Sequence, residues 1–245
     1  MLTPMSKMTA IVLGSGTSQG VPMIGCRCAV SHSADPRDKR TRSSLYVATP
    51  QVRLLVDTTP DLRQQSLREG LDRVDAVLFT HAHADHTMGF DDLRRFCEIK
   101  GGPLPIYGSE PTLAQIERTF FYAFNPGKII PGYVHVLPHI VTGPFRLGEL
   151  EIAPLPVPHG SVSTLGFLFS HGGRKLLAYL SDCASVPEPV RDTVAGAVEA
   201  AGAIGARQSF ITHLTHEKNH VEREQGLPPA VRASYDGMKI EFELG

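Results

Sequence analysis

Three histidines and an aspartate are concentrated in residues 80–86, whose sequence is Thr-His-Ala-His-Ala-Asp-His. Imidazole nitrogens and carboxylate oxygens are ligands that suit zinc, manganese or iron. In a tight turn the first two histidines can face one metal ion, while the aspartate and the last histidine face a second. A polar loop that is merely rich in histidine fits a single His-x-His better than this longer pattern. The candidate ligands are His81, His83, Asp85 and His86.

The elements that must position these residues are strands that end in a histidine or an aspartate. The apolar run 76–79 predicts a buried strand directly before the cluster. Three later predicted strands also end in such residues, and polar side chains from several strand ends can converge at one edge of a sheet. Each of them alone is more often a hydrogen-bonded structural residue than a ligand. These residues are His159, Asp182 and His213.

Asp57 ends another predicted strand, the second arm of a hairpin over residues 45–57. A carboxylate in this place can orient a metal-binding imidazole through a hydrogen bond. The alternative is a helix N-cap for residues 61–69, a role that Thr59 can fill equally well with Pro60 in the first turn.

A glycine-rich loop over residues 14–22 follows the first predicted strand. A dinucleotide site is excluded, because Pro22 follows at once and no helix pattern begins there to receive a pyrophosphate. The loop is either a tight turn or a segment whose hydroxyls, those of Thr17 and Ser18, face the metal site. Cys26 and Cys28 come next, and a Cys-x-Cys pair is half of a zinc site or simply two thiols.

The bulk composition is that of an ordinary globular protein, with 245 residues, 42% of them hydrophobic and 20% charged. The net charge of −1 lacks the basic excess of a protein that grips long nucleic acids. No apolar run reaches membrane-spanning length, and the first ten residues do not resemble a signal peptide. We therefore expect a cytoplasmic protein with no membrane partner and no long nucleic acid partner.

Together, the cluster and the strand-end residues resemble the signature of the metallo-β-lactamase-fold hydrolases. The resemblance implies one domain over residues 1–245, an αββα sandwich of two mixed β-sheets with helices on the outer faces. It also implies two divalent metal ions, zinc or manganese, with Asp85 and Asp182 as catalytic residues. The implied ligands are His81, His83 and His159 for the first ion, Asp85, His86 and His213 for the second, and Asp182 as a bridge between them.

Within this superfamily the chain looks most like the small phosphodiesterases related to the tRNA 3′-end endonucleases, including the carbon–phosphorus lyase accessory phosphodiesterase. The resemblance rests on residues 14–22, on Gly25-Cys26-x-Cys28 and on residues 212–216. It implies a third, structural zinc on Cys26, Cys28 and His216. The relatives' third cysteine falls at Ser31 here, which leaves the site weakened, empty or completed by His32.

The same relatives carry a histidine-containing loop between the bridging aspartate and the last metal histidine, and that histidine is thought to protonate the leaving oxygen. No histidine lies between Asp182 and His213 in this chain, so the general acid has no candidate. We expect a homodimeric phosphodiesterase in which a metal-bound hydroxide attacks a small nucleotide or cyclic phosphate ester. The alternatives are a thioester hydrolase of the hydroxyacylglutathione type and a degenerate member that binds nucleotides without turnover.

Overall fold

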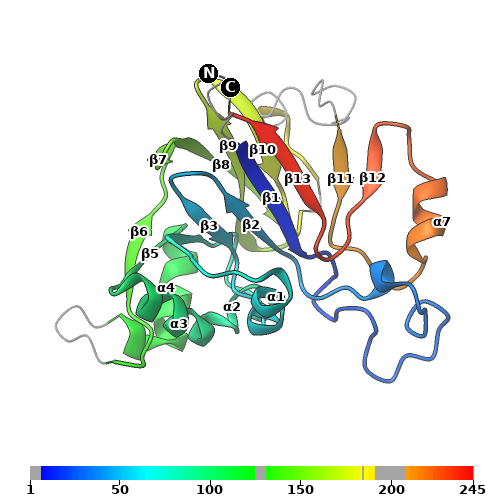
Figure 1. The fold of residues 1–245 in the computed structure, drawn as a ribbon, viewed down its shortest axis with the longest axis horizontal. Coiled ribbons are helices and arrows are strands. Elements are labelled where there is room, and N and C mark those ends of the chain that lie inside the picture. Colours follow the sequence, from blue (N-terminus) through cyan, green and yellow to red (C-terminus); the bar gives the residue numbers. More distant parts are fainter. Residues whose placement is uncertain (1–6, 125–130, 184, 191–207, 245) are drawn as a thin grey trace, which may run out of the picture.

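The computed structural model describes residues 7–124, 131–183, 185–190 and 208–244 (Figure 1). Its largest sheet has seven strands in the order β13-β1-β2-β3-β4-β5-β6. The pairs from β3 to β6 are parallel and the pairs from β13 to β3 are antiparallel, so this sheet is mixed. The strands are β1 (Lys7–Gly14), β2 (Ser44–Ala48), β3 (Arg53–Val56), β4 (Ala76–Leu78), β5 (Leu104–Gly108), β6 (Val136–Ile140) and β13 (Lys239–Glu243).

A second sheet has four strands in the order β10-β9-β8-β7, and all of its described pairs are antiparallel. The predicted layered α/β fold is confirmed, but the expectation that both sheets are mixed is corrected for this one. The reason is that its consecutive strands are joined by short turns, which allow only antiparallel pairing. Its strands are β7 (Phe145–Leu147), β8 (Leu150–His159), β9 (Val162–His171) and β10 (Arg174–Tyr179).

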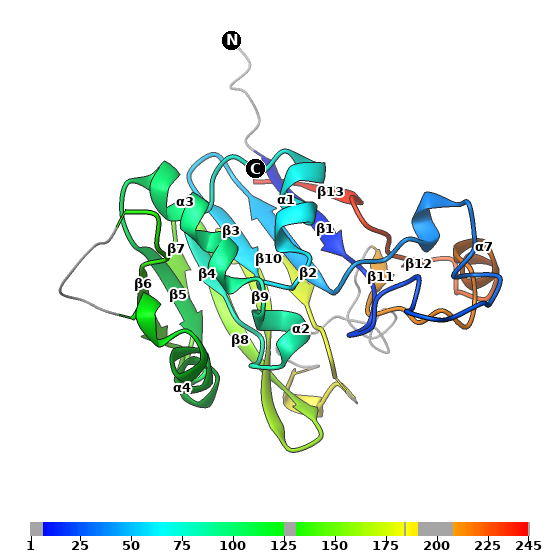
Figure 2. The same cartoon turned by 90° about the horizontal axis from the view of Figure 1, so that it is seen from below.

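Three helices lie against the outer face of the seven-stranded sheet (Figure 2). They are α1 (Leu62–Glu69), α3 (Leu93–Lys100) and α4 (Glu110–Thr119). The short helix α2 (Ala84–Thr87) contains two of the metal-ligand candidates, and the helical turns η2 (Phe90–Asp92) and η3 (Phe121–Ala123) follow α2 and α4. The sequence pattern also predicts helices over residues 186–194 and 197–204; these lie mostly outside the described residues, although residues 188–190 are helical.

A smaller lobe stands beside the sandwich (Figure 1). It combines a two-stranded parallel sheet, which the sequence did not predict, with the long loop that follows β1. Its elements are η1 (Pro36–Asp38), β11 (Ser209–Ile211), α7 (His220–Gln225) and β12 (Val231–Ala233). None of the helices among the described residues has the length and apolar character needed to cross a lipid bilayer.

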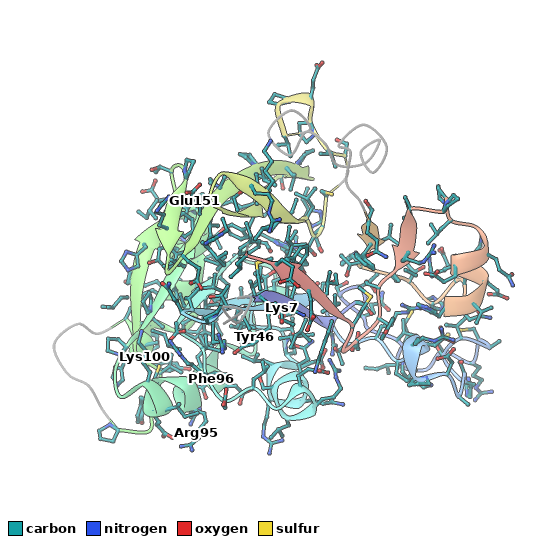
Figure 3. The ribbon with its side chains drawn as sticks, turned by 45° about the horizontal axis from the view of Figure 1, so that its top comes forward. Lys7, Tyr46, Arg95, Phe96, Lys100 and Glu151 are labelled. Carbon is teal, nitrogen blue, oxygen red and sulfur yellow. The ribbon has the colours of Figure 1, made fainter. Side chains whose placement is uncertain are left out.

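The alternation of side chains along the strands divides the core into layers. On β1, Val12 faces the second sheet and packs in the same cluster as Phe167 and Phe169, whereas Ile11 faces the helices. On the helical side, Tyr46 of β2 and Phe96 of α3 belong to one buried cluster, and Figure 3 labels both. The two sheets are therefore held face to face, and their strand ends meet at a common edge.

Tyr46 makes stability depend on pH in the alkaline range. Its hydroxyl donates a hydrogen bond of 2.6 Å to the carbonyl oxygen of Arg73, and burial raises its pKa from 10.0 to about 12. The folded state thus favours the neutral phenol; this stabilisation is complete below pH 10 and is lost as the pH rises to 12. Two pKa units correspond to about 3 kcal/mol.

We therefore expect Tyr46→Phe to reduce the loss of unfolding free energy between pH 10 and pH 12 by about 2 kcal/mol relative to wild type. At pH 8 the same variant should be less stable by about 1 kcal/mol, because it loses the hydrogen bond to Arg73. Urea unfolding at a series of pH values measures both effects. Parallel stability curves for the two proteins would show that the phenol does not titrate in this way.

Candidate metal centre

The short strand β4 delivers the histidine cluster to the edge where the two sheets meet. Its residues Ala76–Leu78 are buried and pair in parallel with β3 and β5, so the chain leaves the sheet at the carboxyl end of β4. The next residues turn sharply into α2, with His81 and His86 fully buried. Parallel pairing in the centre of the sheet therefore fixes where the cluster lies.

The structure brings together all seven side chains that the sequence singled out. Their ligand atoms fall into overlapping groups whose members lie within 4.8 Å of one another. His81 Nε2 and His83 Nδ1, for example, are 3.0 Å apart. These side chains come from four segments: the turn after β4, the end of β8, the segment after β10 and the segment after β11. The groups are His81, His83 and His159; His81, His86 and Asp182; and Asp85, Asp182 and His213.

The two carboxylate oxygens of Asp182 face different histidines. Oδ2 lies 4.0 Å from His81 Nε2 and 3.8 Å from His159 Nε2. Oδ1 lies 3.4 Å from His86 Nε2 and 3.1 Å from His213 Nε2. Each oxygen thus belongs to one half of the site, which is the arrangement of a carboxylate that bridges two cations.

The residues fit metal ions by distance and by their unused lone pairs. A tetrahedral zinc ion with ligand bonds of about 2.0–2.1 Å keeps its ligand atoms about 3.3 Å apart, within the range seen here. The Nε2 atoms of His86 and His213 are buried and make no hydrogen bond. Buried polar atoms normally have a partner, so two orphaned imidazole nitrogens aimed at one carboxylate indicate a place for a cation.

Hydrogen bonds at Nδ1 set the tautomers of two of these histidines. Asp57 Oδ2 accepts from Thr80 Oγ1 and from His86 Nδ1, each at 2.8 Å. Because the Thr80 hydroxyl donates its hydrogen bond to Asp57, its oxygen accepts one from His81 Nδ1 at 2.9 Å. Both histidines therefore carry their proton on Nδ1 and keep Nε2 free to bind a metal.

The charges at the site also favour a cation. Burial and the neighbouring His86 lower the pKa of His81 to about 3, so His81 is neutral near pH 7 and available as a ligand. Burial lowers the pKa of His86, but three neighbouring carboxylates raise it to about 12, so a metal ion binds at its Nε2 by displacing a proton. Burial raises the pKa of Asp182, yet the close imidazoles of His213 and His86 outweigh it and hold that pKa well below its usual range.

Backbone strain is concentrated at the same place. Asp57, Asp182 and His213 have φ angles of 63°, 48° and 58°, and among the described residues they are the non-glycine residues with positive φ. Such conformations are unfavourable for residues with a Cβ and persist only where the surrounding structure holds them. Each of the three lies within three residues of the end of a strand, and each has its side chain in the group of candidate ligands or in contact with it.

The prediction that Asp57 orients an imidazole is supported, and the helix N-cap alternative is not. Asp57 contacts Thr80 and His86, whereas the amide of Asp61 hydrogen-bonds to Thr59 Oγ1 at 3.1 Å. We expect Asp57→Asn to weaken metal binding about 10–100-fold, because it removes the charge that fixes the His86 tautomer. A chelator competition titration measures this, with the exposed Asp72→Asn as control. Equal affinities for both variants would contradict the assignment.

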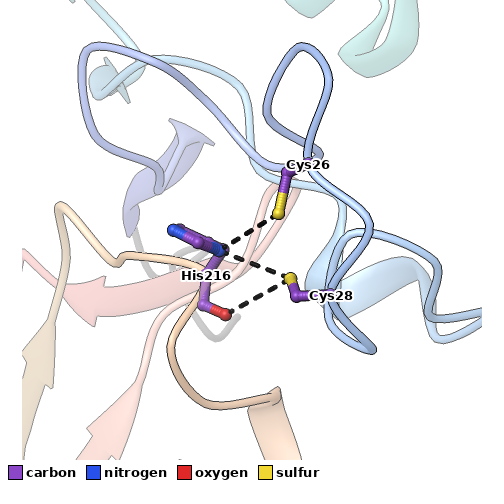
Figure 4. A group of neighbouring side chains, drawn as sticks. All are labelled: Cys26, Cys28 and His216. Carbon is purple, nitrogen blue, oxygen red and sulfur yellow. Dashed lines mark hydrogen bonds between the residues drawn. The ribbon is translucent and has the colours of Figure 1, made fainter.

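A second group of candidate ligands lies in the lobe beside the sandwich (Figure 4). Cys26 Sγ and Cys28 Sγ lie 3.6 Å and 3.4 Å from His216 Nδ1, so the three residues that the resemblance implies as zinc ligands lie together, and zinc binding stays a prediction. Ser31, at the relatives' cysteine position, is 3.5 Å from Cys28 through its hydroxyl. Hydrogen bonds from Ser31 and His216 lower the pKa of Cys28 to about 6, which favours the thiolate that binds zinc. His32 instead pairs with the Cys28 carbonyl oxygen at 3.1 Å.

The loop hydroxyls have a less direct relation to the site. Thr17 and Ser18 make no hydrogen bond to the metal-ligand candidates among the described residues, so their role toward a substrate stays a prediction. Arg42, which ion-pairs with Asp61 at 3.0 Å, donates to the Ser18 carbonyl oxygen at 3.1 Å and holds this loop. No sequence pattern marks Thr80 as the link between Asp57 and His81, because threonine is also a common strand residue.

Comparison with known proteins places the chain in a family. Residues 52–218 match the model of the beta-lactamase superfamily domain. The crystal structure of a new diphosphatase from the PhnP family is 36% identical in sequence, covers 97% of this chain and 98% of its own, and superposes with a TM-score of 0.86.

Two curated relatives are also similar. Coenzyme PQQ synthesis protein B of Methylorubrum populi is 32% identical over 77% of this chain and 70% of its own length. An octanoyltransferase of Porphyromonas gingivalis is 35% identical over 95% of this chain, which spans only 51% of that protein. The family match, the sandwich of two sheets and the strand-end residues agree: the chain belongs to the metallo-β-lactamase superfamily and lies near its PhnP branch.

Proposed function

We propose that this protein is a metal-dependent phosphodiesterase that hydrolyses a small nucleotide or a cyclic phosphate ester. The observation that carries the proposal is the division of Asp182 between two sets of ligands, which fits a pair of cations rather than one. The similar protein that covers nearly the whole chain is named a diphosphatase, and its substrate class also contains bonds to phosphorus.

The proposed roles follow from the positions of the side chains. His81, His83 and His159 would hold one cation, Asp85, His86 and His213 would hold the other, and Asp182 lies between the two groups. When bound, two such cations polarise a phosphoryl group and make a water molecule a nucleophile at neutral pH. The chain itself supplies fixed positions and compensating negative charge: Asp57 and Thr80 lock two imidazoles, and the carboxylates of Asp85 and Asp182 balance the cations.

A substrate panel tests the proposal. The protein loaded with zinc or manganese is assayed with bis-p-nitrophenyl phosphate, with 2′,3′- and 1,2-cyclic phosphates, and with a glutathione thioester. We expect turnover of phosphodiesters, and its loss after the metal is removed with a chelator. A preference for the thioester would support hydrolysis of the hydroxyacylglutathione type instead. Nucleotide binding without turnover under any added metal would indicate a degenerate member.

A further inference from the structure

The metal-ligand candidate His213 is held from a distant part of the chain. The amide of the next residue, Leu214, donates a hydrogen bond of 2.8 Å to the carbonyl oxygen of Ser15. Gly16 forms isolated bridges with both Arg42 and Leu214. His213 itself has a φ of 58°, a conformation that needs support from its surroundings. The loop after β1 therefore sets the backbone position of this histidine.

Asp236 in turn holds that loop. Its Oδ1 accepts hydrogen bonds from the amide and the hydroxyl of Ser15, each at 2.8 Å. Its Oδ2 accepts from the amide of Thr41 at 2.8 Å, from the Thr41 hydroxyl at 2.6 Å and from Arg68 Nη1 at 3.2 Å. The Asp236 side chain is 5% exposed, and Ser15 is fully buried. One carboxylate thus joins the end of β1, the segment before β2, and α1.

We propose that Asp236 is a positioning residue for the second cation, acting through Ser15 and Leu214 on His213. This inference rests on the proposed function, because it presumes that His213 binds a metal. The matched family domain spans residues 52–218, so it contains His213 and Leu214 but neither Ser15 nor Asp236.

The local packing holds the start of this loop tightly against the segment before β2. A Cβ on Gly14 would lie 1.9 Å from the carbonyl oxygen of Arg42, so β1 and the segment before β2 approach as closely as backbones can. The amides of the buried Ser15 and of the half-buried Thr41 both depend on Asp236 for their hydrogen bonds. An unpaired buried amide is costly, so a change at Asp236 should shift the loop rather than leave these donors unsatisfied.

Asp236→Asn is the informative substitution, because it keeps the size of the side chain. Asparagine has one acceptor oxygen and one donor group, so it can satisfy the amide of Ser15 or that of Thr41, but not both. We expect the affinity for the second ion, beside His213, to fall about 10-fold or more, while the affinity for the first ion stays as in wild type. A competition titration with a chromophoric chelator measures both affinities without any assay of activity.

The matched control is Asp75→Asn. Asp75 accepts from the amide of Arg53 at 2.8 Å and from Arg73 Nε at 2.8 Å, so it is also a carboxylate that anchors backbone, but before β4 and away from the metal centre. It should leave both affinities unchanged. A double variant gives a second readout: in a His213→Ala background, Asp236→Asn should cause no further loss of metal affinity, because its path to the site is already cut.

The outcomes separate the inference from the proposed function. A wild-type protein that binds fewer than two ions refutes the dinuclear centre, and this appears in the wild-type titration alone. A wild type with two ions and an Asp236→Asn variant that also keeps both at full affinity overturns the positioning role. Equal weakening of both ions overturns it as well, since that is the result of a general structural defect. If Asp236→Asn does not fold, Ser15→Ala, which loses one of the five hydrogen bonds, must show a smaller loss confined to the second ion.

Discussion

Replacing Asp182 by asparagine is expected to lower kcat for bis-p-nitrophenyl phosphate by about 10³-fold, because the change removes about 4 kcal/mol of transition-state stabilisation. The two oxygens of Asp182 face separate sets of histidines, and a neutral amide cannot balance two cations. The substitution keeps the shape of the side chain, so the loss reports charge and coordination rather than packing. Steady-state kinetics with saturating metal, together with the metal content of the purified variant, measure the effect.

The control for this variant is Asp91→Asn, which removes a carboxylate from a half-exposed position a few residues beyond His86. Asp91 accepts a hydrogen bond from the Tyr122 hydroxyl at 2.9 Å and takes no part in the groups of ligand candidates. Its variant should retain wild-type kcat. If Asp182→Asn turned over the phosphodiester as fast as Asp91→Asn does, Asp182 could not be the bridge between two catalytic cations.

The largest effect on stability is expected from Asp38→Ala, a loss of about 3–5 kcal/mol in the free energy of unfolding. Arg40 is fully buried, and Asp38 Oδ1 lies 3.4 Å from its Nη2 and accepts from the amide of His220 at 2.7 Å. Without Asp38, the guanidinium keeps only the carbonyl oxygen of Ser234, at 3.1 Å from Nη1, and its Nε has no partner. A buried charge without a counter-charge is far more costly than an exposed one.

The neighbouring ion pair of Asp35 and Arg37 provides a matched control, because its atoms are closer together but its side chains are more exposed. Its atoms are 2.6 Å apart, with side-chain exposures of 25% and 42%. Asp35→Ala should cost about 1 kcal/mol or less. The double variant Asp38→Ala/Arg40→Met should recover part of the lost stability, since it removes both charges. Urea unfolding measures all three; equal small losses for Asp38→Ala and Asp35→Ala would show that burial does not control the strength of these pairs.

The parts of the site that the sequence predicted correctly are those carried by local patterns. A few neighbouring residues are enough to recognise the apolar run before His81. The same is true of a histidine or aspartate that ends a later strand. His81 follows a parallel strand, whereas His159 and Asp182 follow β8 and β10, which run in the same direction on either side of β9 and so end at one edge of their sheet. The hairpin of β2 and β3, and helix α1, were also predicted because turn residues and apolar periodicity mark them.

The contacts that sequence patterns could not predict join distant residues. Asp236 and Ser15 are far apart in the chain, and nothing near either of them signals the other. The positive φ of Asp182 and His213 likewise comes from tertiary contacts that override the preference of a residue with a Cβ. The pairing of β11 with β12 was missed for the same reason, because a parallel pair needs a crossover whose partner strand cannot be read locally.

Anomalous X-ray scattering at the zinc absorption edge, from crystals of the zinc-loaded protein, tests most directly whether these side chains form a dinuclear centre. We expect two peaks about 3.5–4 Å apart, one among His81, His83 and His159 and one beside His213, with Asp182 between them. A single peak, or none in this region, would contradict the assignment on which the proposed hydrolysis depends.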